Sequence, residues 1–299
     1  MSKDTTGYIN LPAFHEFLLG DIKIIALSDG TAAVPTEKLM LYAEPGEVAA
    51  LMKAGFVAVD YEASINAFLF RLAEKLILID TGAGDLMGPA SGHLLSSLEA
   101  AGFSPDEVDA VVLTHIHADH SGGLITDGRP AFKNATLYVS QADFDYWLSE
   151  EQMLAVKPER QQSFRNAVAK VKPWSDAGMV QTFTGDQELF PGLTSWAQPG
   201  HTPGHTYYML ESKGNILVFC GDIVHVAEIQ LSNPAIAITL DVDPDAAVIQ
   251  RKAFLAEAEA GGFWLAADHI SFPGIGHIRQ AGEGYSWIPA AFSVRQDRV

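Results

Sequence analysis

The alternation of apolar and polar residues divides the chain into short strands and amphipathic helices. Two apolar runs, at residues 66–72 and 75–80, flank Ala73-Glu74 and are predicted to form a pair of strands joined by a turn. Strands are also predicted at 22–27, 108–114, 137–140, 179–184, 193–198, 206–211, 215–221 and 263–267.

Helical spacing of apolar residues appears between these strands. It predicts a short helix after Pro45, a helix over 93–101, and a polar helical segment over 141–172 that forms an insertion or a lid. Pro244 to Ala260 is the clearest helix, because Asp243 can cap its first turn and Gly261-Gly262 ends it. Strands in both halves with interspersed helices favour a layered α/β domain.

Neither a repeat nor a long linker interrupts this pattern, so residues 1–299 are predicted to form a single domain, with 1–20 as an N-terminal extension. Apolar residues make up 48% of the chain, which is enough for a sizeable core. No apolar run is long enough for a membrane span, and the first residues lack the apolar core of a signal peptide. We therefore expect a cytoplasmic protein that does not bind membranes.

Charge and cysteine content narrow the possible partners. Nineteen Lys and Arg against 37 Asp and Glu give a formal net charge of −18, which disfavours binding to nucleic acid or to anionic membrane surfaces. The one cysteine, Cys220, rules out an intrachain disulfide and Cys-rich zinc modules. A small-molecule substrate is the remaining expectation for an enzyme of this composition.

The strongest chemical signal is the segment Thr114-His115-Ile116-His117-Ala118-Asp119-His120, followed by Ser121-Gly122-Gly123. Three histidines and an aspartate follow a predicted buried strand, and loops at strand ends commonly carry functional sites. Imidazole and carboxylate are the ligands that zinc and similar divalent metals take. Several neutral imidazoles packed together without a metal would be poorly hydrogen-bonded. The segment therefore predicts a metal site.

Two further segments place a potential ligand directly after a strand: His201 in Pro199-Gly200-His201-Thr202, and Asp222 in Cys220-Gly221-Asp222. Together with Asp80-Thr81-Gly82, the histidine-rich segment and a late histidine, they resemble the metallo-β-lactamase superfamily over about residues 66 to 270. This resemblance implies an αββα sandwich with two divalent metal ions between its sheets. Zn²⁺ is the expected metal, with Mn²⁺, Fe²⁺ and Co²⁺ as alternatives.

The resemblance also implies the metal ligands. One metal is assigned to His115, His117 and His201, the second to Asp119, His120 and a late histidine, and Asp222 would bridge both. For the late histidine we favour His269, which directly follows a predicted strand; His277, in a glycine-rich loop, is the alternative.

Three other residues near these motifs receive supporting roles. His205 is expected to be structural or to orient a ligand, and Asp80 to support the histidine loop rather than bind metal. Strand alternation points Cys220 away from Asp222 and into the core.

A closer resemblance covers 221–226, 241–244, 267–277 and 285–289. These segments are similar to the branch that holds methyl parathion hydrolase and the dihydrocoumarin hydrolase-type lactonases. They imply a homodimeric hydrolase of aryl lactones and aryl esters, with organophosphate triesters as promiscuous substrates. His225 and the absence of an export signal favour the lactonase members. A dedicated organophosphate triesterase and an acyl-homoserine lactonase remain alternatives.

The implied mechanism is attack by a metal-bridging hydroxide, because metal ions lower the pKa of bound water. Asp222 or His225 would transfer the remaining proton. The substrate pocket is expected to be apolar, although ordinary core packing is the alternative for most of its candidate walls. These candidates are Met40, Met87, Trp147, Phe164, His225, Phe272 and Ile275.

Other functional classes fit the sequence less well. A glutathione thioesterase would need a basic cluster, and none is visible. A diiron oxygen-reducing module carries a glutamate where this chain has Ala118. A metal-binding sensor without catalysis stays open, but the complete set of seven candidate ligands favours an enzyme.

Overall fold

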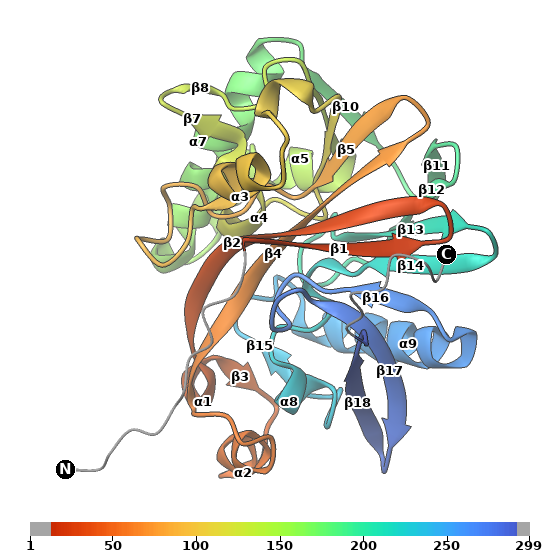
Figure 1. Cartoon of the computed structure of the whole chain (residues 1–299). Helices are drawn as coiled ribbons and strands as arrows, with labels where there is room; N and C mark the ends of the chain where they lie inside the picture. The colour runs from red at the N-terminus through yellow and green to blue at the C-terminus, as the bar shows by residue number, and fades with distance from the viewer. Residues whose placement is uncertain (1–12, 292–299) are drawn as a thin grey trace.

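Two seven-stranded sheets lie face to face, with helices on their outer sides (Figure 1). A computed structural model describes residues 13–291. In spatial order, the first sheet contains β1 (Phe14–Leu19), β2 (Ile22–Pro35), β4 (Asp60–Leu72), β5 (Lys75–Ile79), β6 (Ala110–Val112), β9 (Thr136–Ser140) and β10 (Val180–Phe183). The second contains β11 (Gln187–Phe190), β12 (Leu193–Ala197), β13 (Thr206–Ser212), β14 (Asn215–Phe219), β16 (Trp264–Ala266), β17 (Ile275–Ala281) and β18 (Gly284–Pro289). The predicted αββα sandwich is confirmed.

The central strands are continuously apolar because both of their faces are buried. In β4, Leu69 points towards the outer helices, whereas Phe68 and Phe70 point into the space between the sheets. There Phe70 stacks on Phe219 of the second sheet, with ring centroids 5.2 Å apart. Successive side chains of a strand point to opposite faces, so a strand between two layers needs apolar residues at every position.

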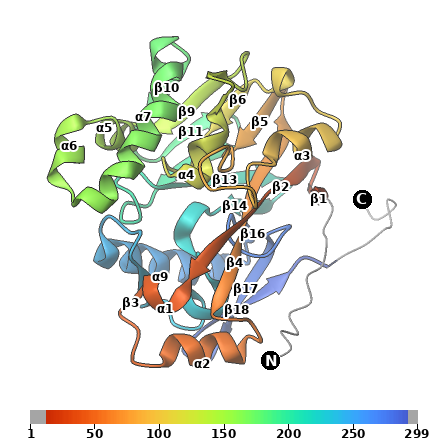
Figure 2. The same cartoon turned by 90° about the vertical axis from the view of Figure 1, so that its left-hand side faces the viewer.

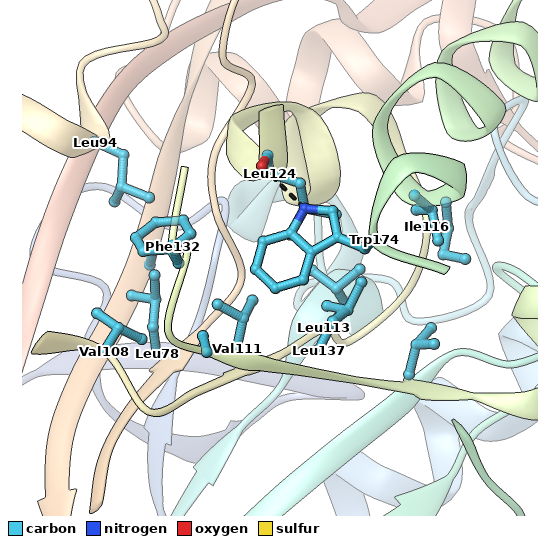
Figure 3. Close-up of a cluster of buried hydrophobic side chains, with 14 of the residues drawn as sticks. Leu78, Leu94, Val108, Val111, Leu113, Ile116, Leu124, Phe132, Leu137 and Trp174 are labelled. Atoms are coloured by element: carbon cyan, nitrogen blue, oxygen red, sulfur yellow. Dashed lines mark hydrogen bonds between the residues drawn. The ribbon is translucent and has the colours of Figure 1, made fainter. Parts of the chain in front are cut away.

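The outer layer over the first sheet is made of short helices and one long helix, α7, grouped at one side of the molecule (Figure 2). Their bounds are α3 (Leu94–Ala100), α4 (Ala118–Ser121), α5 (Gln141–Trp147), α6 (Glu150–Ala155) and α7 (Gln161–Asp176), with 3₁₀ turns at Pro105–Glu107, Gly122–Leu124 and Pro158–Arg160. Trp174 of α7 is fully buried and its indole N–H donates to the carbonyl of Leu124 at 3.0 Å (Figure 3). This bond anchors α7 to the chain just beyond the histidine-rich segment.

Helix α9 (Pro244–Gly261) covers the second sheet. The Asp243 side chain accepts a hydrogen bond from the Ala246 N–H at 3.0 Å, and Gly262 ends the helix with a left-handed φ of 61°. Both predicted ends of this helix are confirmed. The adjoining short elements are a 3₁₀ turn at Gly221–Ile223 and α8 (Ala227–Gln230).

Long strands β2 and β4 extend beyond the sandwich and carry a small apolar cluster at one end of the molecule (Figure 1). Its elements are α1 (Thr36–Leu39), β3 (Met40–Leu41), α2 (Glu47–Ala54) and β15 (Ala237–Ile238). Strand β15 pairs with β3, and a separate small pair is formed by β7 (Ile125–Thr126) and β8 (Arg129–Pro130). The helix predicted after Pro45 is confirmed as α2.

Some elements differ from the prediction. Residues 14–19, assigned to an N-terminal extension, form edge strand β1 against β2, while residues 1–12 lie outside the described part of the chain. The hairpin of β17 and β18 was not predicted, because one end of it is exposed and polar. Strand β6 is shorter than 108–114, since the chain leaves the sheet to form the histidine loop. Within residues 13–291, no helix has the length and apolarity needed to cross a membrane.

A buried arginine on α9 holds several loop carbonyls beneath the helix, and its replacement tests how much these hydrogen bonds stabilise the fold. The Arg251 side chain is 1% exposed and donates to the carbonyls of Ile223, Pro234 and Ile236. Arg251→Met would remove all three hydrogen bonds and leave the Ile236 carbonyl with only the Gln230 amide at 3.3 Å, so we expect the free energy of unfolding to fall by about 2–4 kcal/mol. Urea unfolding of chelator-treated protein measures this change. Lys252→Met, on an exposed neighbouring position, should change it by less than about 0.5 kcal/mol; equal effects of the two variants would contradict the prediction.

Candidate metal centre

All seven predicted ligands lie together where strands of both sheets end. The first sheet supplies the segment after β6, and the second supplies the loops after β12, β14 and β16. Two groups have their donor atoms within 4.8 Å of one another: His115, His117, His201 and Asp222, and Asp119, His120 and His269. His115 and Asp222 are 107 positions apart in sequence and meet only because the two sheets pack face to face.

In the first group, three imidazole nitrogens converge on one carboxylate oxygen. Nε2 of His201 lies 2.9 Å from Nδ1 of His117, which in turn lies 3.0 Å from Nε2 of His115. Oδ2 of Asp222 lies 3.1 Å from Nε2 of His201 and 3.6 Å from Nε2 of His115. Neutral imidazoles that turn lone pairs towards each other at these distances repel, whereas a cation between them is stabilised by all of them.

The second group uses the other oxygen of Asp222. Oδ1 lies 3.1 Å from Nε2 of His120 and 3.0 Å from Nε2 of His269. Oδ2 of Asp119 approaches the same His269 nitrogen at 3.5 Å. The two oxygens of one buried carboxylate therefore face one group each, which is the arrangement expected of a bridging ligand.

The outer nitrogens of the histidines are already occupied. Nδ1 of His120 lies 2.8 Å from Oδ2 of Asp80, and Nδ1 of His201 lies 2.8 Å from Oδ1 of Asp241. Nδ1 of His269 lies 2.9 Å from the carbonyl oxygen of Ser64. An N–H on the outer nitrogen leaves the inner nitrogen as a lone-pair donor to metal, the usual setting of a metal-binding histidine. The donor set fits a dinuclear metal site.

The pKa shifts of the ligand residues indicate that the site is stabilised by positive charge. Burial alone would lower the pKa of His201 and His269, but Asp222 and the neighbouring carboxylates outweigh it and raise both values to about 9. Burial would raise the pKa of Asp222, yet the surrounding imidazoles hold it well below its usual range. Asp222 is therefore an anion in this setting, and positive charge accumulates around it.

Two buried aspartates, Asp80 and Asp143, hold the ligand loops in place. Asp80, at a left-handed φ of 58°, accepts hydrogen bonds from the backbone and the hydroxyl of Thr114 at 2.8 and 2.7 Å. This agrees with its expected supporting role. Asp143 accepts from the backbone N–H of Ile116 and of Gly204, at 2.8 and 2.7 Å, and so links the loops of His115 and His201.

The roles of Asp143 and Asp241 were not predicted from the sequence. Asp143 lies in a predicted helix with no spacing that sets it apart, whereas Asp241 stands within a segment that already resembled the lactonase branch. Asp268 is also buried against this layer: its Oδ2 lies 3.8 Å from Nδ1 of His120, and burial together with Asp80 raises its pKa well above the usual range.

The remaining predicted residues occupy distinct positions. Nε2 of His205 accepts a hydrogen bond from the Asp222 backbone N–H at 2.9 Å, so His205 positions the bridging residue. Gly221 has a φ of 54°, and a Cβ there would lie 2.6 Å from that same nitrogen, so only glycine fits. His277 lies away from both groups and hydrogen-bonds the carbonyl of Phe263. Cys220 is buried in the core of the second sheet.

A pocket of about 300 Å³ opens beside the two groups and is bordered by His117, Asp119 and Asp222. Met87, Trp147 and Phe164, three of the predicted walls, line it. Trp147 contacts His117 edge to face with ring centroids 5.1 Å apart, and Phe164 contacts Trp147 at 4.7 Å. The helical segment 141–172 therefore forms one wall of this pocket.

The other predicted wall residues lie elsewhere. His225 is buried beside the metal groups, with Nε2 3.1 Å from Oδ2 of Asp222. Met40 packs in the apolar cluster with α2, and Phe272 and Ile275 line a separate pocket. Phe272 and Ile275 were predicted as walls because they are close to His269 in sequence, and this prediction was wrong. The chain turns after His269 and directs both side chains away from the metal ligands.

The comparisons with known proteins agree on one protein family. Residues 60–269 match the sequence profile of the metallo-beta-lactamase superfamily. The crystal structure of hydrolase AbOPH, of the beta lactamase superfamily, is 35% identical and superposes with a TM-score of 0.90 over 95% of this chain and 100% of that one. AidC, a dizinc quorum-quenching lactonase solved with its product, is 26% identical with a TM-score of 0.83 over 95% and 100%.

Sequence relatives match over shorter stretches. An N-acyl homoserine lactonase of Bacillus thuringiensis is 24% identical over 128 residues, 42% of this chain and 43% of that protein. A human acyl-coenzyme A thioesterase is 29% identical over 170 residues, 54% of this chain and 58% of that protein. The chain thus spans about half the length of these relatives.

Asp222 offers the sharpest test of the shared centre. Because its two oxygens face both groups, we expect Asp222→Ala to lower the metal content from about two ions per chain to one or fewer and to remove nearly all hydrolysis. Elemental analysis of protein purified without chelators measures the metal content. Asp21→Ala, which removes an exposed carboxylate paired with Lys213, should keep both ions. A fully active Asp222→Ala protein with two metals would refute the bridging role.

Proposed function

The chain belongs to the metallo-beta-lactamase superfamily and is a metal-dependent hydrolase, and from this premise we propose that it hydrolyses neutral lactones and aryl esters at a dinuclear zinc centre. The observation that carries the proposal is the apolar, aromatic pocket that opens directly onto the two ligand groups. Such a pocket binds uncharged, partly apolar molecules, with a few polar groups setting their orientation. Organophosphate triesters share these properties and are proposed as promiscuous substrates.

The assigned ligands are those of the sequence prediction. His115, His117 and His201 would hold one ion, Asp119, His120 and His269 the other, with Asp222 between them. Two zinc ions there would supply Lewis acidity and, by lowering the pKa of water, a hydroxide at neutral pH. Manganese, iron and cobalt also suit histidine and aspartate ligands.

The chain's own residues position the substrate. Trp147 and Phe164 form an aromatic wall beside His117, against which an aryl ring or an acyl chain can pack. Met87 and Leu240, exposed by 40% and 48%, lie at the pocket and extend this apolar surface towards solvent. The modest pocket volume of about 300 Å³ favours small lactones and esters over large substrates.

His225 is the proposed proton donor to the leaving oxygen. Its ring is buried, stacks near His269 with centroids 5.6 Å apart, and approaches Asp222 through Nε2. Nδ1 of this ring has no hydrogen-bond partner among the residues of the described chain. The backbone N–H of His225 donates to the Gln230 side chain at 2.7 Å, which fixes the position of the loop.

A second candidate is hydrolysis of N-acyl homoserine lactones. The likeness to AidC across 95% of this chain supports it, as does an apolar wall that suits an acyl chain. Dihydrocoumarin and an acyl homoserine lactone differ in the oxygen that leaves, a phenolate in the first and an alkoxide in the second. A triesterase as the main activity and homodimerisation stay predictions of the sequence resemblance, and a cytoplasmic location stays a prediction from the apolar pattern of the sequence.

Metal content and substrate range test the proposal together. We expect about two metals per chain, and turnover of dihydrocoumarin or N-hexanoyl homoserine lactone that is lost on chelation and restored by Zn²⁺ or Mn²⁺. Paraoxon and a glutathione thioester serve as comparison substrates and should be slower. Two bound metals with no lactone or ester turnover would overturn the proposal, and paraoxon as the fastest substrate would favour the triesterase alternative.

The leaving group separates a proton-donor role for His225 from simple packing. An alkoxide must be protonated as it leaves, whereas a phenolate leaves readily without a proton. We expect His225→Gln to reduce kcat for N-hexanoyl homoserine lactone by at least about 10-fold and for dihydrocoumarin by less than about 3-fold. His277→Gln makes the same change away from the centre and should leave both rates near wild type. Equal losses on both substrates would contradict proton donation.

A further inference from the structure

A second pocket of about 270 Å³ lies apart from the metal centre. We call it the Glu228 pocket; its polar and aromatic walls are Tyr61, Glu228, Ser271, Phe272 and Trp287. These residues come from β4, α8, the segment after His269 and β18. The Glu228 pocket shares no lining residue with the pocket at the metal ligands.

The carboxylate in this pocket has no compensating charge. Oε2 of Glu228 is buried and has no hydrogen-bond partner in the part of the chain that the structure describes. Neither lysine nor arginine is among the described residues that line the pocket. Burial raises the pKa of Glu228, which shows that the anion is poorly stabilised there. A half-buried carboxylate whose Oε2 has no partner is stabilised by a cation that enters the pocket.

The direction of the Glu228 side chain is fixed by packing. Its stem fills the space beside Gly55 at the end of α2, where a Cβ would lie 2.4 Å from Cγ of Glu228. The backbone of Glu228 belongs to the first turn of α8. The carboxylate therefore has little freedom to turn out towards solvent on the α2 side.

The aromatic walls add a second preference for positive charge. Rings of Tyr61, Phe272 and Trp287 line the pocket, and their faces attract cations. Burial and the nearby charge of Glu228 raise the pKa of Tyr61 to about 12, so its phenol stays neutral, with the Ser271 hydroxyl in hydrogen-bonding range. The pocket thus offers one anion, neutral hydroxyl oxygens and apolar surface.

We propose that the Glu228 pocket binds a small organic cation, a protonated primary amine with a short apolar chain. The three N–H groups of its ammonium would pair with Glu228 and the hydroxyls of Tyr61 and Ser271, and its chain would lie against Phe272 and Trp287. A divalent metal fits less well, because it would find a single carboxylate. The net charge of −18 raises the local concentration of any cation.

Calorimetric titration of the metal-loaded protein with n-butylammonium chloride tests this site, with sodium chloride holding the ionic strength constant. We expect saturable binding with a Kd of about 1 mM or below. Tetramethylammonium has the charge but no N–H donors and should bind at least about 10-fold more weakly. Because the readout is binding, it is independent of whether the proposed lactonase activity is found.

Matched variants connect the binding to Glu228. Glu228→Gln keeps the shape, removes the charge and should weaken n-butylammonium binding by at least about 10-fold. Glu74→Gln makes the same charge change in the exposed turn between β4 and β5 and should bind as wild type does. Phe272→Leu, which removes one ring, should weaken binding about 3-fold or more. Non-saturable binding, or equal affinity of wild type and Glu228→Gln, would overturn the proposal.

Discussion

The structure depends on one buried carboxylate. Asp222 is 3% exposed and presents one oxygen to each of two groups of histidines, so it needs positive charge on both sides at once. Burying an anion is costly unless its partners are held at the right distance. Those partners come from both sheets, and contacts such as Phe70 on Phe219 keep the sheets in register behind the site. The apolar core between the sheets therefore sets the geometry of the polar site at their edge.

Hydrogen bonds across the seam complete this arrangement. The Asn66 amide donates to the carbonyls of Ala267 and Ile270, at 2.9 and 2.8 Å, and holds the loop of His269 against the first sheet. Asp143 does the same for the loops of His115 and His201. Side chains that link loops in this way fix the ligand positions before a metal binds, which lowers the reorganisation that binding requires.

The sequence predicted the features that are local along the chain. The apolar runs of β4 and β5 and the capped helix α9 carry their own signals, and four candidate ligands stand within six residues of one another. Features that depend on contacts between distant segments could not be predicted from local sequence patterns. Strand β1 is stabilised by pairing with β2, and Asp143 acts only once the loops of both sheets meet it. Phe272 follows His269 closely in sequence, but the turn between them directs it to another pocket.

The two pockets favour ligands of different charge. At the metal centre, two divalent cations bring more positive charge than Asp119 and Asp222 remove, so an incoming carbonyl or phosphoryl oxygen is attracted even in an acidic protein. In the Glu228 pocket, a single carboxylate without a compensating cation favours positive ligands. A protonated amine that binds at Glu228 would be repelled by the positive charge of the metal-loaded centre, so it would not compete with the substrate there. Opposite local charge thus separates two binding sites on one small sandwich.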